Sequence, residues 1–258
     1  MAAEGLNLAT EPRENPAGAG VEWIAEGWRL FARAPLMWIV AILVIIVIAV
    51  VVGIVPLVGT IAFQVAQPVF AAGLMVACRS LETGGEFEIE HVFAGFKQNL
   101  AGLVIVGLIF MAASLTLLLV FALFAGFGLV MAFATGDAQD AWPAIMASGV
   151  SIAFGSLVML LLMVPLLMFY WFAPALVMLH DMAPVAAMKA SFRGCMRNIV
   201  PFLVYGVIML LLSFVAMIPL GLGLLVWVPV AIASTYAAYR MIYTQTASPA
   251  EPAMAKAA

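Results

Sequence analysis

The chain has 258 residues, of which 67% are hydrophobic and only 9% are charged, whereas a soluble domain is about 45–50% apolar and about 25% charged. This composition excludes an ordinary soluble globular protein and predicts an all-α polytopic transmembrane helical bundle, because long apolar runs mark membrane spans. The net charge of −3 argues against a nucleic-acid partner, and the two cysteines are too few for a disulfide framework.

The two ends of the chain lack hydrophobic periodicity. Residues 1–20 and 244–258 are rich in small and polar residues, so we predict disordered cytoplasmic tails around a transmembrane domain at 21–243. The start of the chain lacks the charged and apolar segments of a cleaved signal peptide, and the first span is expected to act as the insertion signal.

An amphipathic helix is predicted from Val21, directly before the first span. Its charged residues share one helical stripe: Glu22, Glu26, Arg29 and Arg33. Trp23 and Trp28 lie among the apolar residues on the rest of the surface. Tryptophan together with arginine is typical of the headgroup layer, so Arg29 and Arg33 are predicted to lie at the lipid interface. The alternative is a surface helix that packs on its own protein.

The first two spans are predicted at about 37–55 and 60–78. Gln64 and Gln67 are the most polar pair inside a span, and their spacing puts them on one helical face. Hydrogen bonding between helices is the expected role of such a pair. A polar pore lining is the alternative.

Two very long apolar runs occupy the middle of the chain, at 101–136 and 144–179. One helix over the first run would be about 54 Å long at about 1.5 Å per residue, whereas a bilayer core is about 30 Å thick. Each run therefore either projects beyond the membrane or breaks. Gly126 and Gly128 are the candidate break points in the first run, and Pro165 and Pro174 are candidate kinks in the second. Unbroken runs give six spans and folded runs give eight, and the lack of polar turn residues in their centres favours six.

A basic amphipathic segment precedes the fifth span. Lys189, Arg193 and Arg197 recur every four residues on one helical stripe. The apolar residues that fall mostly on the other side are Val185, Met188, Phe192 and Met196. The pattern predicts a helix in the membrane interface whose three cations contact anionic headgroups.

The last two spans are predicted at about 199–217 and 224–243. Tyr236, Tyr239 and Arg240 lie near the end of the sixth span. We interpret these three residues as an anchor in the membrane interface.

A short pattern of a small residue, an aromatic residue and a cation recurs before three of the spans. The three copies are Gly27-Trp28-Arg29, Gly95-Phe96-Lys97 and Ser191-Phe192-Arg193. A proline and an arginine eleven residues apart also recur, as Pro68 with Arg79 and Pro229 with Arg240. These patterns predict three parallel units, each an interfacial helix followed by a two-span hairpin. Interfacial anchors that arose independently are the alternative.

The distribution of charge predicts the orientation. With six spans, all ten Lys and Arg residues fall on the side that holds both termini. The loop between the two long runs, on the opposite side, holds only Asp137 and Asp140. The positive-inside rule therefore puts both termini in the cytoplasm, and folding each long run as a hairpin would leave this side unchanged.

No ionisable residue lies deep inside a predicted span, which disfavours a proton-driven pump. His91 and His180 lie beside acidic residues at the membrane boundary. Two histidines without further ligands are interpreted as ordinary boundary residues rather than a metal or acid–base site. The sequence thus predicts no catalytic site, no cofactor and no metal.

Three stretches resemble a family of uncharacterised bacterial multi-pass membrane proteins. The stretches are GWRLFARAPLMWI, YWFAPALVMLHDMAPVAAMKASFRGCMRNIVPFLVYG and TYAAYRMIY. The resemblance covers about residues 22–243 and implies a six-span protein of the inner membrane with unknown function. The positions that match the recurrent ones of the family are Phe172, Ser191, Phe192, Asn198, Phe202, Tyr205, Tyr239 and Arg240.

Two functions are consistent with these patterns. We favour a structural or accessory membrane protein, not an enzyme, whose cationic helices contact anionic lipids or a partner at the cytoplasmic leaflet. The alternative is a channel or transporter for an uncharged or lipidic solute. Membrane lipids are the expected partners, and the sequence indicates neither a protein partner nor an oligomeric state.

Overall fold

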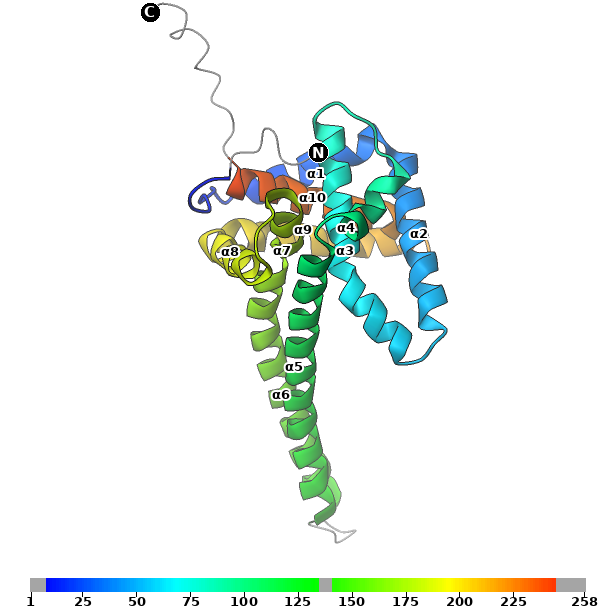
Figure 1. The fold of residues 1–258 in the computed structure, drawn as a ribbon. Helices are drawn as coiled ribbons and strands as arrows, with labels where there is room; N and C mark the ends of the chain where they lie inside the picture. The colour runs from blue at the N-terminus through cyan, green and yellow to red at the C-terminus, as the bar shows by residue number, and fades with distance from the viewer. Residues whose placement is uncertain (1–7, 135–140, 245–258) are drawn as a thin grey trace, which may run out of the picture.

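The computed structural model describes residues 8–134 and 141–244, whose regular structure is helical throughout (Figure 1). The remainder of both predicted tails and the loop with Asp137 and Asp140 lie outside the described residues. The helices are α1 (Ala19–Arg33), α2 (Pro35–Gly53), α3 (Val58–Glu82), the 3-10 helix η1 (Ile89–Phe93), α4 (Ala94–Lys97), α5 (Leu100–Ala134), α6 (Ala141–Tyr170), α7 (Ala173–His180), α8 (Pro184–Arg197), α9 (Ile199–Met217) and α10 (Leu224–Tyr243).

Six segments of the described chain are long and apolar enough to cross a membrane, as predicted. They are Pro35–Gly53, Val58–Glu82, Leu100–Phe127, Gly149–His180, Ile199–Met217 and Leu224–Tyr243. Large aliphatic side chains on these helices point away from the protein, among them Leu161 at 71% and Leu203 at 62% exposure. So much exposed apolar surface is suited to lipid and not to water. The chain is an integral membrane protein.

The two long apolar runs form one helical hairpin, in which α5 and α6 pack against each other and extend well beyond the other helices (Figure 1). Helix α5 continues through Gly126 and Gly128, and α6 continues through Pro165. The helix breaks only at residues 171–172, and Pro174 then stands in the first turn of α7. The breaks considered at Gly126 and Gly128 are therefore wrong, and the helix is also continuous at Pro165. Packing of α5 against α6 stabilises the helical conformation at the glycines of α5 and the proline of α6.

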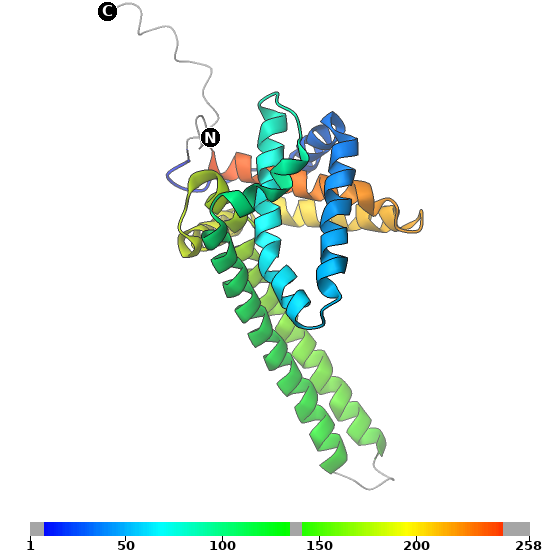
Figure 2. The same ribbon diagram turned by 45° about the vertical axis from the view of Figure 1, so that its right-hand side comes forward.

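The three hairpins are joined in a closed ring by the short helices that precede them. Helix α4 with η1 packs on α3, the last helix of the first hairpin, and α8 packs on α6 and α7, the last helices of the second. Helix α1 packs on α10, the last helix of the third hairpin, and so closes the ring. From this ring the hairpins diverge, with α9 and α10 running across the direction of α5 and α6 (Figure 2).

The small residue of each repeated triplet lies at one of these three contacts. A Cβ on Gly27 would lie 2.2 Å from Oγ of Ser234 in α10, and one on Gly95 would lie 2.4 Å from the carbonyl oxygen of Val69 in α3. In the third copy, Oγ of Ser191 accepts a hydrogen bond from the backbone N–H of Phe172 at 2.9 Å and donates to the carbonyl oxygen of Met168 at 2.6 Å. The triplet thus carries a docking residue in each unit.

Residues 8–18 are held against the protein by hydrogen bonds, which differs from the disorder expected for the whole of 1–20. Leu8 forms a β-bridge with Thr244, and the backbone N–H of Arg13 donates to the carbonyl oxygen of Ile242 at 2.8 Å. Asn198 accepts hydrogen bonds on Oδ1 from the backbone and the side-chain nitrogen of Asn15, at 2.9 and 3.0 Å. The segment lacks periodicity because it is held by backbone and amide hydrogen bonds instead of an apolar face.

Candidate functional site

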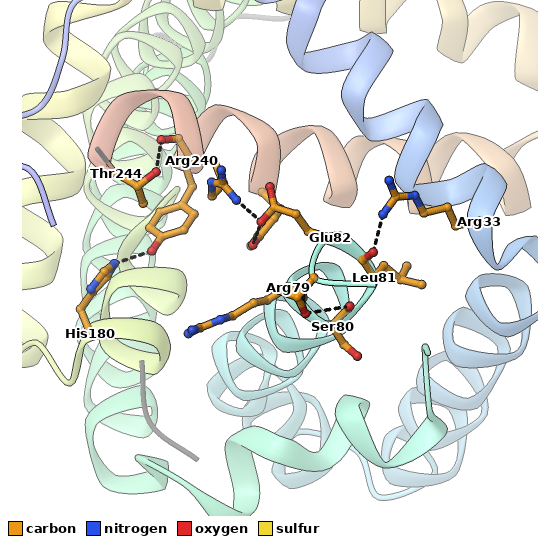
Figure 3. A network of polar contacts seen from close by, with 11 residues as sticks. Arg33, Arg79, Ser80, Leu81, Glu82, His180, Arg240 and Thr244 are labelled. Carbon is orange, nitrogen blue, oxygen red and sulfur yellow. Dashed lines mark hydrogen bonds and ion pairs between the residues drawn. The ribbon is translucent and has the colours of Figure 1, made fainter. Parts of the chain in front are cut away.

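The ends of the helices that close the three hairpins meet in a cluster of charged and aromatic side chains (Figure 3). We call this cluster the polar junction. It consists of Arg33, Arg79, Glu82, His180, Tyr236, Tyr239 and Arg240. Its residues come from α1, α3, α7 and α10, so it connects all three hairpins.

Glu82, at the end of α3, is the centre of one half of the polar junction. Its carboxylate forms an ion pair with the guanidinium of Arg240 and accepts a hydrogen bond from the hydroxyl of Tyr236 at 2.7 Å. The side chains of Arg240 and Glu82 are only 27% and 32% exposed. Tyr236, Tyr239 and Arg240 lie on one face of α10 because residues three and four apart are neighbours on a helix. This spacing directs all three toward the ends of α3 and α7.

The other half of the polar junction joins α7 to α10. Nε2 of His180 lies 2.5 Å from the hydroxyl oxygen of Tyr239. Arg79 acts electrostatically on both groups, and its side chain extends from α3 toward this side of the cluster (Figure 3).

Arg33 joins α1 to the end of α3. Its guanidinium donates to the carbonyl oxygen of Leu81 (Figure 3). The last carbonyls of a helix lack partners within the helix and carry partial negative charge. A cation is therefore well placed here.

The interpretation of Tyr236 and Tyr239 as anchors in the headgroup layer is wrong, and Arg240 pairs with Glu82. Tyr236 is 1% exposed and Tyr239 is 0% exposed, so neither ring can reach lipid. Their partners, Glu82 and His180, are far away in the sequence. Aromatic residues next to a cation form the same sequence pattern whether they contact lipid headgroups or buried polar groups of the same protein.

A cavity of about 750 Å³ opens beside the polar junction, between α1, α10, the end of α3 and the N-terminal segment. Its charged lining residues are four arginines and three glutamates: Arg13, Arg29, Arg33, Arg240, Glu14, Glu26 and Glu82. Nε of Arg240 is buried and has no hydrogen-bond partner among the described residues. The lining therefore has four positive charges against three negative ones.

The five cations predicted at the lipid interface are all exposed, but they fall into two separate groups. Arg29 and Arg33 line the cavity on α1, and Arg29 also forms an ion pair with Glu26 at 2.6 Å. Lys189, Arg193 and Arg197 lie on α8.

Arg197 differs from the other two cations of α8 because it contacts the N-terminal segment. Its guanidinium binds the carboxylate of Glu11 at 2.5 Å and donates to the carbonyl oxygen of Pro12 at 2.8 Å. The apolar side of α8 also departs from the simple pattern. Val185 and Met196 are exposed at 52% and 47%, while Met188 is buried.

Gln64 and Gln67 do not form a common inner face in the structure. Gln64 is half-buried, whereas Gln67 is exposed on the outside of α3. Neither lines any of five cavities found among the described residues.

The histidines and cysteines each have a local structural contact or are buried. Nδ1 of His91 accepts a hydrogen bond from the backbone N–H of Glu88 at 3.1 Å and so caps η1. Cys78 is a buried free thiol, and burial raises the pKa of Cys195 to about 12, which keeps that thiol protonated at neutral pH. Within residues 8–134 and 141–244, no three His, Cys, Asp or Glu side chains are grouped to hold a metal ion. What the site offers chemically is charge and hydrogen-bond donors.

Comparison with known proteins supports placement in the inner membrane. The chain is 29% identical to a probable inner membrane protein of Burkholderia thailandensis over 231 residues, which cover 87% of this chain and 83% of that protein. No family profile and no solved structure matches the chain. The similarity confirms the predicted resemblance to inner-membrane proteins of bacteria.

Eight residues match recurrent positions of the family that the sequence resembles. Most of them lie where two helices of the closed ring contact each other. Ser191 bridges α8 to the break before α7, Asn198 holds the N-terminal segment, and Arg240 pairs with Glu82. The ring of Phe202 in α9 lies 5.0 Å from Trp23 of α1 and 5.9 Å from Phe172, centroid to centroid. These positions hold the three units together.

Proposed function

We propose that the protein is a non-catalytic integral membrane protein that binds the anionic lipid surface of the cytoplasmic leaflet through α8. The observation that carries this proposal is the exposure of Lys189 and Arg193 on the same helix as exposed Val185 and Met196. Apolar side chains that enter the acyl region, beside cations that reach the headgroups, are the hallmark of an interfacial helix. The ionic contact of Arg197 with the N-terminal segment leaves two of the three predicted cations for lipid.

The same proposal places the polar junction and both termini in the cytoplasm. The turns at residues 54–57 and 218–223, at the far ends of two hairpins, carry no Lys or Arg, whereas the junction end carries all nine Lys and Arg of the described residues. The positive-inside rule then assigns the junction end to the cytoplasm. A reporter that works only in the periplasm should be active when fused at Asp137 and silent after Arg79, Lys189 or Tyr243. Activity after Arg79 or Tyr243 would reverse the assignment.

Lipid preference of the whole protein tests the role of α8. Purified protein is equilibrated with equal amounts of phosphatidylglycerol and phosphatidylcholine, and retained lipids are counted by native mass spectrometry. A cation near an anionic surface contributes about 1 kcal/mol, so Lys189→Gln with Arg193→Gln should reduce the preference for phosphatidylglycerol by about 2 kcal/mol. High salt should weaken the preference of the native protein.

The matched control exchanges the two cations and keeps their charge, as Lys189→Arg with Arg193→Lys. This variant should keep the native preference. If the glutamine variant also kept it, α8 would not be the lipid-binding surface.

The alternative function, a channel or transporter for an uncharged or lipidic solute, requires a polar path through the spans. The exposed position of Gln67 and the half-buried position of Gln64 give it no support.

A further inference from the structure

We propose that the arginine-lined cavity beside the polar junction is a binding site for a phosphate-type anion. The ligand is either the phosphodiester of an anionic phospholipid headgroup or free inorganic phosphate. The site is formed by α1, α10, Glu82 of α3 and the N-terminal segment, and it does not depend on the lipid contact proposed for α8.

The pairing of charges inside the cavity leaves positive charge for a ligand. Two of the three carboxylates pair with arginines of the lining, because Glu26 pairs with Arg29 at 2.6 Å and Glu82 pairs with Arg240. The remaining charges of the lining are Glu14 against Arg13 and Arg33, which is a net charge of +1. Arg33 donates to the carbonyl oxygen of Leu81, which is a neutral partner. This contact therefore leaves the positive charge of Arg33 without a carboxylate to balance it. A planar guanidinium donates two parallel hydrogen bonds to phosphate oxygens, which makes arginine the usual residue for this anion.

The hydrogen-bond donors of the cavity point to the same ligand. Arg29 and Arg33 are exposed on the cavity wall, so a ligand in the cavity can reach their side chains. Guanidinium groups carry only donors and no acceptor, which suits an oxygen-rich anion. Asn15 and Thr244 add further polar groups to the wall.

The rest of the lining accommodates a headgroup better than a fully hydrated ion. Leu30, Ala237 and Met241 form an apolar part of the wall. The glycerol of a phospholipid headgroup can contact this part while the phosphate faces the arginines. The cavity also lies at the ends of the spans, at the level where lipid headgroups occur.

Calorimetric titration of the full-length protein in a non-ionic detergent tests the site. The probes are inorganic phosphate, dihexanoyl phosphatidylglycerol and the zwitterionic dihexanoyl phosphatidylcholine. We expect saturable binding of phosphatidylglycerol, of phosphate or of both, and weaker binding of phosphatidylcholine. Binding of phosphatidylglycerol but not phosphate identifies the membrane as the source of the ligand, and the reverse identifies the cytosol.

Matched single substitutions assign the binding to this cavity. Arg33→Gln should weaken binding at least about tenfold, because it removes a charge-assisted bidentate contact. Arg29→Gln should also weaken it, since it leaves Glu26 unpaired in the wall. Lys97→Gln is the control: Lys97 is 64% exposed and pairs with Glu90, as Arg29 is 69% exposed and pairs with Glu26, but Lys97 lies outside the cavity.

The control should bind as the native protein does. Arg29 is a surface residue, so its variant decides the matter even if Arg33→Gln folds poorly. The proposal is overturned by an absence of binding, by equal binding of the two phospholipids, or by equal losses in Arg29→Gln and Lys97→Gln. If the lipid preference proposed for α8 were disproved, each of these outcomes would still test the cavity.

Discussion

Helices α1 and α8 have the same kind of sequence but meet different surroundings. Both are amphipathic, both precede a span, and both carry cations at helical spacing. The cations of α1 line a cavity and bind the end of α3, whereas Lys189 and Arg193 of α8 face outward. A charge stripe therefore identifies the polar face of a helix, but not what that face contacts.

The apolar faces explain the difference. Helix α1 lies along α10 and buries Trp23 completely against Phe202 and Tyr205 of α9. Helix α8 buries smaller residues such as Ser191 and Cys195 and leaves Met196 exposed. A helix that buries large aromatic residues gains more from packing on protein, so its orientation is set by the protein and not by the membrane.

The largest loss of stability is expected from a substitution that disrupts the packing of α1 on α10. A side chain at Gly27 would collide with Ser234, whose Oγ and backbone nitrogen lie 2.2 and 2.6 Å from the position of a Cβ. Gly27→Leu should reduce the free energy of unfolding by about 3 kcal/mol, because overpacking displaces α1 from α10. Thermal unfolding in detergent, followed by tryptophan fluorescence, measures the loss.

The control for this substitution is Gly206→Leu in α9. A Cβ on Gly206 would have no neighbour within 4 Å, so this variant should unfold near the native temperature. Equal losses in the two variants would contradict the role of Gly27 in closing the ring.

The second largest effect should come from the link between α8 and the N-terminal segment. Asn198 is fully buried, accepts from Asn15, and donates to the carbonyl oxygens of Arg13 and Gly194 at 2.8 and 2.9 Å. Asn198→Ala should cost about 2 kcal/mol, since it removes several buried hydrogen bonds at once. Limited proteolysis should then cut within residues 8–18.

Asn15→Ala is the milder partner of that experiment, because it removes only the side-chain half of the pair and leaves the backbone bond to Asn198 in place. Its segment should be cut more slowly than in Asn198→Ala. If Asn198→Ala resisted proteolysis like the native protein, the segment would be held without Asn198, by its backbone bonds to α10 and its contacts with Arg197.

Local patterns predicted the helices and spans well, because successive helical turns of each span contain apolar residues, so each span can be recognised from its own sequence. The repeated triplet was also informative, since its small residue is a packing requirement. The partners of the polar junction could not be predicted in the same way. Glu82 and Tyr236 are 154 positions apart, and nothing in the local sequence of either names the other. Such pairings depend on the closed ring, which exists only in the folded chain.

The sequence alone shows neither the continuity of α6 through Pro165 nor the hydrogen bonds of residues 8–18, for related reasons. A proline removes one hydrogen bond from a helix, but α6 is supported along its length by α5. The N-terminal segment is ordered by hydrogen bonds to α10 and Asn198 and has no apolar face of its own. Periodicity detects neither kind of support.

The smallest predicted effect compares one cation from each helix in the absence of added lipid. Arg33 of α1 bonds to the carbonyl oxygen of Leu81 and so contributes to the fold, whereas Arg193 of α8 is exposed on the surface. Arg33→Gln should lower the free energy of unfolding in detergent by about 1 kcal/mol, the usual size of one such hydrogen bond. Arg193→Gln should change it by less than about 0.5 kcal/mol, as exposed charges usually do. Both variants lose one positive charge, so a general effect of net charge would lower both unfolding temperatures equally. Equal losses would mean that α1 and α8 hold their cations in the same way, and the distinction between an inward and an outward stripe would be wrong.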